Sequence, residues 1–211
     1  MVTVDQVLLD PRVAESQQPD LTLDEPPPAV TPAPYRFSVE DFYRMGEEGI
    51  LNHDERLELL NGEIFMMPPI DPGHADRTDY CQRRLMRILG DKWLVRCQHP
   101  VRLGPEAEPI PDIAVVKPDD YSRRHPAPAE VALIVEVANS SLAFDLRTKR
   151  RLYAVAAIPE YWVMDLSARR LHVFSDPREG EYHSQRILER GDAVRSNILD
   201  DKAIDVSELL P

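Results

Sequence analysis

The sequence predicts an α/β domain built around a mixed β-sheet. Beyond residue 35, the predicted elements run in the order helix, hairpin, helix, three strands, helix and further strands. Residues 112–116 and 131–137 are short and almost wholly apolar, which is typical of strands buried on both faces. The helix predicted at about 143–157 is long enough for a right-handed crossover from strand 131–137 to a parallel strand at 161–166.

Length and composition exclude several classes of protein. The chain has 211 residues, which suits one domain of ordinary size with an appendage. No apolar run approaches the ~20 residues that a membrane helix needs, and no secretory signal is visible at the N-terminus. Cys81 and Cys97 are too few for a disulfide framework or a cysteine zinc site. We therefore expect reduced thiols in a cytoplasmic protein that does not associate with membranes.

Residues 1–34 differ from the remainder of the chain. They contain seven prolines, six acidic residues and one basic residue, and they show no hydrophobic period. Such a segment cannot bury enough apolar surface to offset the entropy of ordering it, so we expect a disordered acidic tail, with a partner-binding arm as the alternative. This tail contributes −5 to the net charge of −12, which leaves −7 for the domain at 35–211. A nucleic-acid surface on so acidic a domain must be a local patch.

The remaining elements follow from local signals. Ser38 and Asp41 are placed as reciprocal caps of a first helix that can end at Gly49. Residues 74–90 show helical spacing, and the C-terminal DVSELLP is expected to add one last docked turn. Besides the three strands already named, strands are expected at 93–103, 170–175 and 181–188.

Asn61-Gly62 predicts a two-residue hairpin turn within residues 57–67, because both positions accept a positive φ. This turn pairs Leu60 with Glu63 and Glu58 with Phe65. Leu57, Leu59, Ile64 and Met66 then share an apolar face, and Glu58 and Glu63 lie on the other.

Glu136 is the most informative single residue, because it interrupts the apolar strand VALIVEV. A buried carboxylate costs several kcal/mol unless it is paired or bound to a cation. Asp112 begins the preceding strand, and if the two strands are neighbours both carboxylates can point to one spot at the edge of the sheet. Mg²⁺ is held by one or two carboxylates together with waters and substrate phosphates. The alternative for Glu136 is a structural ion pair or a strand end that has reached solvent.

Several further residues can join these acids. Asp145, Lys149 and Tyr153 are spaced to line one face of the crossover helix, where the Lys149 ammonium can polarise a water or stabilise charge on a phosphate. The alternative is a solvated Asp–Lys pair. Glu63 is a candidate third carboxylate for which Glu58 competes, and a solvated hairpin face is the alternative for both. His74 follows Pro72-Gly73 and either contacts a phosphate or serves as a polar residue at a helix start.

The ordered fragments RLELLNGEI, His74, PDIAVV, LIVEVANSS, Asp145 with Lys149, Tyr153 and IPEYWVMDL resemble the Uma-two restriction endonuclease family. This family belongs to the PD-(D/E)xK nuclease superfamily, and the resemblance covers roughly residues 36–208. It implies a restriction-endonuclease-like core of helix, three strands, helix and strand, with a β-hairpin in front.

The resemblance also implies roles. Asp112 and Glu136 would bind Mg²⁺ or Mn²⁺, and Glu63 would be the additional acid. Ala138 stands where the superfamily usually has its lysine, so Lys149 would supply that lysine from the next helix. His74, Tyr153 and Arg150 would contact substrate. Apart from the resemblance, six basic residues on the two helices could grip the nucleic-acid backbone, with a solvated helix face as the alternative: Arg83, Arg84, Arg87, Arg147, Arg150 and Arg151.

The expected protein is a metal-dependent DNA endonuclease that acts as a homodimer. The alternative is a catalytically silent nuclease-fold module with a binding or regulatory role. Loss of the acids would favour this module, whereas the presence of Asp112, Glu136 and Lys149 favours the nuclease. A homo-oligomeric interaction protein, joined through 161–166 and the C-terminal strands, is compatible with either.

Overall fold

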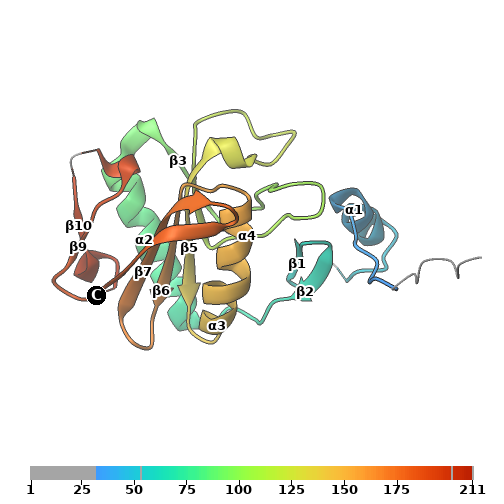
Figure 1. The fold of residues 1–211 in the computed structure, drawn as a ribbon, viewed down its shortest axis with the longest axis horizontal. Coiled ribbons are helices and arrows are strands. Elements are labelled where there is room, and N and C mark those ends of the chain that lie inside the picture. Colours follow the sequence, from blue (N-terminus) through green and yellow to red (C-terminus); the bar gives the residue numbers. More distant parts are fainter. Residues whose placement is uncertain (1–31, 53, 201, 211) are drawn as a thin grey trace, which may run out of the picture. The chain divides into compact units, whose positions relative to one another are not determined.

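The computed structural model describes residues 32–52, 54–200 and 202–210. Tyr35–Pro211 forms one compact unit, whose fold is drawn in Figure 1. The expected disordered tail, residues 1–34, lies almost entirely outside the described residues and stays a prediction.

The helices and strands follow the predicted order closely. They are α1 (Val39–Glu47), β1 (Leu57–Leu60), β2 (Glu63–Met66), α2 (Pro72–Leu89), β3 (Leu94–Cys97), β4 (Ile113–Val116), β5 (Val131–Ala138), α3 (Leu142–Phe144), a π-helical turn (Asp145–Lys149), α4 (Arg150–Val155), β6 (Glu160–Asp165), β7 (Arg170–Arg178), β8 (Glu181–Leu188), β9 (Ala193–Val194) and β10 (Ile204–Asp205). Short 3-10 turns lie at Gly90–Lys92, Pro128–Glu130, Asn197–Leu199 and Val206–Glu208. The last of these is the docked C-terminal turn that the sequence predicts.

Six strands form one mixed sheet in the order β3-β4-β5-β6-β7-β8. Only β5 and β6 pair in parallel, and the helical segment α3–α4 crosses over between them, as predicted. The strand expected at 93–103 is shorter, because β3 pairs with β4 only from Leu94 to Cys97. The next residue, Gln98, has a φ of 51°, which ends the extended run, and Pro100 has no N–H to donate to a ladder.

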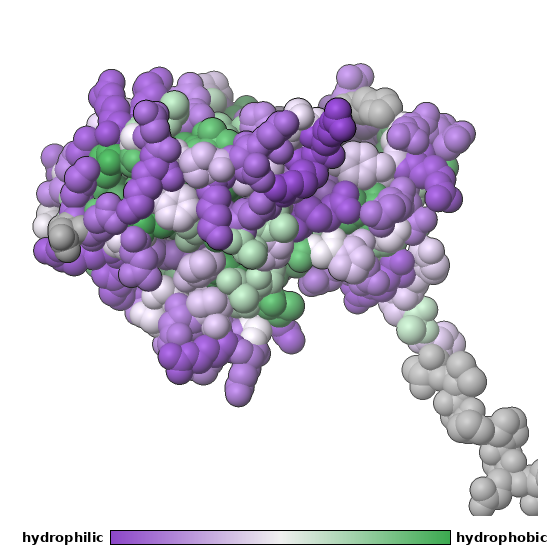
Figure 2. Space-filling view, turned by 90° about the horizontal axis from the view of Figure 1, so that it is seen from above, coloured by the Kyte–Doolittle hydropathy of each residue, from purple (hydrophilic) through white to green (hydrophobic). Residues whose placement is uncertain are grey.

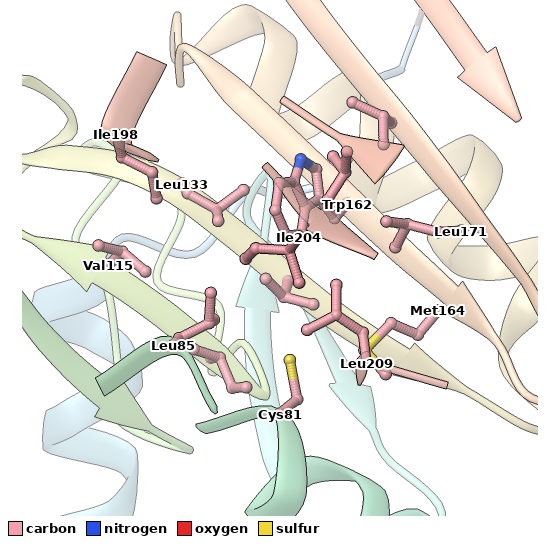
Figure 3. Close-up of a cluster of buried hydrophobic side chains, with 14 of the residues drawn as sticks. Cys81, Leu85, Val115, Leu133, Trp162, Met164, Leu171, Ile198, Ile204 and Leu209 are labelled. Atoms are coloured by element: carbon pink, nitrogen blue, oxygen red, sulfur yellow. The ribbon is translucent and has the colours of Figure 1, made fainter. Parts of the chain in front are cut away.

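Alternation along the central strands divides the core into two layers. Leu133, Val135 and Val137 of β5 pack with Leu85 of α2 and with the C-terminal segment. Figure 3 shows this layer, in which Trp162, Ile204 and Leu209 converge on side chains of α2 and the sheet. The opposite face of β5 carries Ile134, Glu136 and Ala138, so Glu136 points to the side of the sheet that α3–α4 covers.

The crossover helix contains an irregular turn that the sequence does not predict. Between α3 and α4, Asp145–Lys149 forms a π-helix, in which the N–H of Arg150 donates to the carbonyl of Asp145. π-turns are rare insertions in α-helices and are frequent at functional sites. Here the turn bears Asp145 and Lys149, both buried.

The hairpin has the predicted register, with Leu60 opposite Glu63 and Glu58 opposite Phe65. Asn61 and Gly62 both have positive φ, as this turn requires. The distribution of burial differs from the expectation, because Glu58 is buried and Met66, on the expected apolar face, is exposed. The hairpin thus turns its Glu58 end toward the crossover helix, where Leu60 and Phe65 pack with Phe144 and Leu152.

The surface shows no large apolar face in the view of Figure 2, where hydrophilic side chains dominate and hydrophobic ones emerge in small groups. Ile50, Met66 and Val155 are exposed on three separate segments. Single exposed hydrophobic residues are usual on protein surfaces. None of the described helices is long and apolar enough to span a bilayer.

Truncating the core at α2 should destabilise the protein strongly. Leu85 is fully buried between α2 and the sheet, so Leu85→Ala should lower the free energy of unfolding by about 2–5 kcal/mol. Met86, next in sequence, is half exposed, and Met86→Ala should change it by less than about 0.5 kcal/mol. Urea unfolding of both variants checks this; equal losses would mean that α2 is not docked as described.

Candidate active site

Two carboxylates meet where β4 begins beside the end of β5. Because these strands are antiparallel and Ile113 pairs with Val135, Asp112 lies opposite Glu136. The Asp112 N–H donates to Glu136 Oε2 at 3.3 Å, and the Val137 N–H donates to Asp112 Oδ2 at 2.8 Å. The structure therefore brings together the two acids that the sequence singles out.

Lys149 reaches this spot from the π-turn. Its Nζ lies 3.0 Å from Glu136 Oε1 and 3.3 Å from Glu58 Oε1, and the three side chains are 2–4% exposed. Tyr153, one turn further along, donates its hydroxyl to Glu136 Oε1 at 2.9 Å. The carboxylate of Glu136 is thus held by a lysine, a tyrosine and a backbone N–H.

The charges in this cluster influence one another. Burial lowers the pKa of Lys149, but the carboxylates of Glu136, Glu58 and Asp145 outweigh burial and hold that pKa above its usual value. Burial raises the pKa of Glu136 well above its usual value, although the Lys149 charge opposes this. Lys149 is therefore a protonated cation at neutral pH and not a base.

Asp145 lies beside this group. Its Oδ2 accepts a hydrogen bond from the Ser141 hydroxyl at 2.6 Å. Burial raises the pKa of Asp145 to about 6, while Lys149 acts in the opposite direction. Asp145 therefore changes charge close to neutral pH.

His74 is the polar neighbour of Asp112. Asp71 caps the start of α2 by accepting the Gly73 and His74 N–H groups, and this places His74 Nε2 3.0 Å from Asp112 Oδ2. Burial raises the pKa of Asp112, but His74 outweighs burial and lowers it overall. Burial lowers the pKa of His74, and Asp112 in turn more than reverses this.

These side chains line a pocket of about 50 Å³, large enough for an ion and a few waters. We call it the carboxylate pocket. Five residues of its polar lining were missed by the sequence reasoning, namely Arg56, Asp71, Asn139, Ser140 and Ser141. Four of them could have been found from the sequence. Residues 139–141 directly follow the strand that carries Glu136, and Asp71 precedes Pro72 at the start of the helix that carries His74.

The other predicted residues lie elsewhere. Glu63 is on the expected face of the hairpin, but at its turn end, where it is half exposed and lies 3.1 Å from Arg36. Glu58, the competing acid, occupies the place in the cluster. Arg150 lies over the Phe174 ring and near Glu181, outside the pocket. Tyr153 is fully buried and contacts Glu136, so it positions that carboxylate and is not accessible to substrate.

None of the six arginines expected to grip a nucleic acid is in the lining of the carboxylate pocket. Arg84 is engaged with Glu208, and Arg83, Arg87, Arg147 and Arg151 are exposed. Their helices turn a different face to the pocket, with His74 at the start of α2 and Lys149 in the π-turn.

The donor atoms fit a hard divalent cation in part. Among residues 32–52, 54–200 and 202–210, no three His, Cys, Asp or Glu side chains group closely enough to hold a metal by themselves. Mg²⁺, however, needs only one or two carboxylates, with waters and phosphate oxygens completing its shell. Asp112 and Glu136 supply such a pair, and buried Glu58 Oε2 lies 3.2 Å from the Lys149 ammonium but accepts no hydrogen bond from any described residue. The residues present thus fit a partly hydrated ion.

The six-stranded mixed sheet with flanking helices and a carboxylate–lysine pocket at its edge defines a restriction-endonuclease-like fold. The model of the Uma2 (Uma-two) family, described as "Putative restriction endonuclease", matches residues 39–207, and the chain belongs to this family. A crystal structure of a protein from Anabaena variabilis, titled a "putative nuclease belonging to DUF820", is similar with a TM-score of 0.65 and 11% identity. The similarity covers 82% of this chain and 97% of that one. No curated protein matches the chain significantly in sequence.

Removing the buried charge of Asp145 should change the pH dependence of stability. Its pKa is higher in the folded chain than in the unfolded chain, so the folded state binds the proton more tightly and stability falls as pH rises from about 4 to about 6. The effect of Asp145→Asn on the free energy of unfolding should therefore become more favourable by about 2–3 kcal/mol between pH 4 and pH 7.5.

Urea unfolding at both pH values measures this difference. Asp176→Asn is the matched control, since Asp176 is exposed and bonds Arg178 at the surface. An Asp145→Asn effect that does not vary with pH would show that Asp145 is not buried beside Lys149.

Proposed function

We propose that this protein is a metal-dependent nuclease that hydrolyses phosphodiester bonds in DNA. The observation that carries the proposal is the convergence of Asp112, Glu136 and Lys149, from three separate segments, on one small pocket. Membership of the Uma2 family supports it. An acidic chain that acts on a polyanion needs a local cationic element, and a bound dication beside Lys149 would supply it.

Asp112 and Glu136 would hold Mg²⁺ or Mn²⁺ in this proposal. The metal would lower the pKa of a bound water and neutralise charge on the phosphate. Lys149, protonated and fixed by Glu58 and Glu136, places a positive charge where negative charge develops during hydrolysis. Tyr153 keeps Glu136 oriented, and His74 does the same for Asp112.

A catalytically silent nuclease-fold module is the second candidate. One observation favours it: Asp112 is already bonded by His74 and a backbone N–H, and Glu136 by Lys149 and Tyr153. A metal would have to share or displace these partners. In such a module the same groups serve stability only.

Substitution of Glu136 should distinguish the metal-dependent nuclease from the catalytically silent module. Glu136→Gln should reduce cleavage of plasmid DNA in Mg²⁺ or Mn²⁺ by a factor of about 100 or more, because the Lys149 ammonium and a bound metal would both lose this carboxylate. The readout is metal-dependent nicking on a gel, together with Mn²⁺ binding by calorimetry. Metal-dependent cutting by Glu136→Gln at the wild-type rate would refute the site; neither cutting nor Mn²⁺ binding by the wild type would favour the silent module.

The hairpin offers a matched pair of glutamates. Glu58→Gln should reduce the cleavage rate about tenfold or more, since Glu58 fixes Lys149 inside the pocket. Glu63→Gln, on the same face of the hairpin but outside the pocket, should stay within about twofold of the wild type. Initial-rate assays measure both variants. Equal losses, or a greater loss in Glu63→Gln, would contradict the assignment of Glu58 as the additional acid of the site.

A further inference from the structure

A second pocket opens next to the carboxylate pocket. It measures about 520 Å³, within the range of sites for small organic groups. Arg56, Glu58, Met67 and Ile110 line both pockets, so the two are adjacent. A group bound in this second pocket would lie close to an ion held in the first.

The walls of this second pocket, which we call the aromatic pocket, are mostly apolar. They come from α1, the segment after it, the hairpin and residue 110, and the apolar members are Phe42, Tyr43, Leu51, Leu57, Met67 and Ile110. The polar members are the amides of Asn52 and Gln98, the Arg56 guanidinium and the carboxylates of Glu47, Glu55 and Glu58. Apolar walls suit the two π-faces of a nucleobase, and amides and carboxylates can pair with its hydrogen-bonding edge.

Gln98 connects this pocket to the candidate active site. Its side-chain Nε2 lies 3.4 Å from Asp112 Oδ1, and its backbone N–H donates to the Asp112 carbonyl at 3.0 Å. Its φ of 51° is uncommon for a residue other than glycine, asparagine or aspartate. The chain thus holds an amide at the boundary between the carboxylates and the apolar walls.

Beyond Tyr43 lies a third pocket, the arginine pocket, of about 600 Å³. Tyr43 lines both this pocket and the aromatic pocket, and the others that line it include Arg102, Arg123, Arg124 and His125. Arg102 is paired with Glu40 and Glu108, and Arg124 with Asp119 and Glu130, but both keep part of the guanidinium side chain exposed. The aromatic pocket therefore lies between the acidic carboxylate pocket and a pocket that presents arginine side chains. That order of chemistry matches phosphate, base and phosphate along one unpaired strand of nucleic acid.

From this arrangement we propose that the aromatic pocket receives an unpaired nucleobase, so that the substrate is single-stranded or locally unpaired nucleic acid. The proposal rests on the nuclease function proposed above and adds the substrate class. A base within a duplex is stacked and paired, and it would have to leave the helix to enter such a pocket.

The test is fluorescence anisotropy with a labelled DNA single strand in Ca²⁺ in place of Mg²⁺ or Mn²⁺, so that a hard dication is present, with a gel to check that the strand stays uncut. The comparison is a strand of the same length and charge in which every nucleotide is abasic. The wild type should bind the normal strand about fivefold or more tightly than the abasic one, since base–aromatic stacking contributes on this scale. A blunt duplex of the same sequence should also bind more weakly.

Two variants locate the effect. Phe42→Ala removes a wall and Leu51→Trp fills the pocket, and both should bring the affinity for the normal strand down to that for the abasic strand. Tyr80→Ala, which removes an exposed aromatic ring on α2 outside these pockets, should keep the wild-type preference. Two pocket variants are used so that a folding defect in one does not decide the result.

Equal binding of normal and abasic strands by the wild type overturns the proposal, as does a preference that survives both pocket variants or an absence of binding to either strand. Cleavage of duplex DNA in Mg²⁺ without preference for the normal strand over the abasic strand would support the nuclease function and contradict the nucleobase site. Tighter binding of the normal strand, without cleavage in any metal, would support the nucleobase site and contradict the nuclease function.

Discussion

The buried ionic cluster of Lys149 with Glu136 and Glu58 is the interaction on which the architecture around the site depends. Its three members come from the crossover helix, the central strand β5 and the hairpin, and all are buried. Buried charges of this kind contribute little net stability as a group, but removing one member typically costs about 3–5 kcal/mol, because the others stay uncompensated. The pair therefore holds the hairpin, the sheet and the helix in one arrangement.

Much of this arrangement could be predicted from the sequence. Apolar runs located the central strands, and Asp112 and Glu136 were expected to meet if these strands were neighbours. The antiparallel pairing that brings Asp112 to Glu136 is known only from the structure. Helical spacing put Lys149 and Tyr153 on the face that meets the sheet. These inferences succeed because they depend on periods of two and of about 3.6 residues, which the local sequence carries.

The rest depended on contacts that no local pattern encodes. Alternation in the hairpin put Glu58 and Glu63 on one face, but only the packing of the hairpin against the crossover helix decides that its Glu58 end is buried and its Glu63 end meets Arg36. Arg150 lies on the same helix as Lys149, yet its side chain covers Phe174. Gln98 gave no signal at all, because its place beside Asp112 follows from the positive φ that ends β3.

The π-turn in the crossover helix has a consequence for how this family can diverge. Each residue of an α-helix turns the chain by about 100°, so loss of one residue from 145–149 would restore a regular helix and rotate the segments before and after it against each other. Asp145 and the residues before it would then leave the register in which Lys149 meets Glu136. Loops such as 117–127 can grow or shrink between relatives without this effect. The length of the segment 142–155 should therefore be better conserved among relatives than the identity of most of its residues. Insertions and deletions in an alignment of relatives should lie outside this segment.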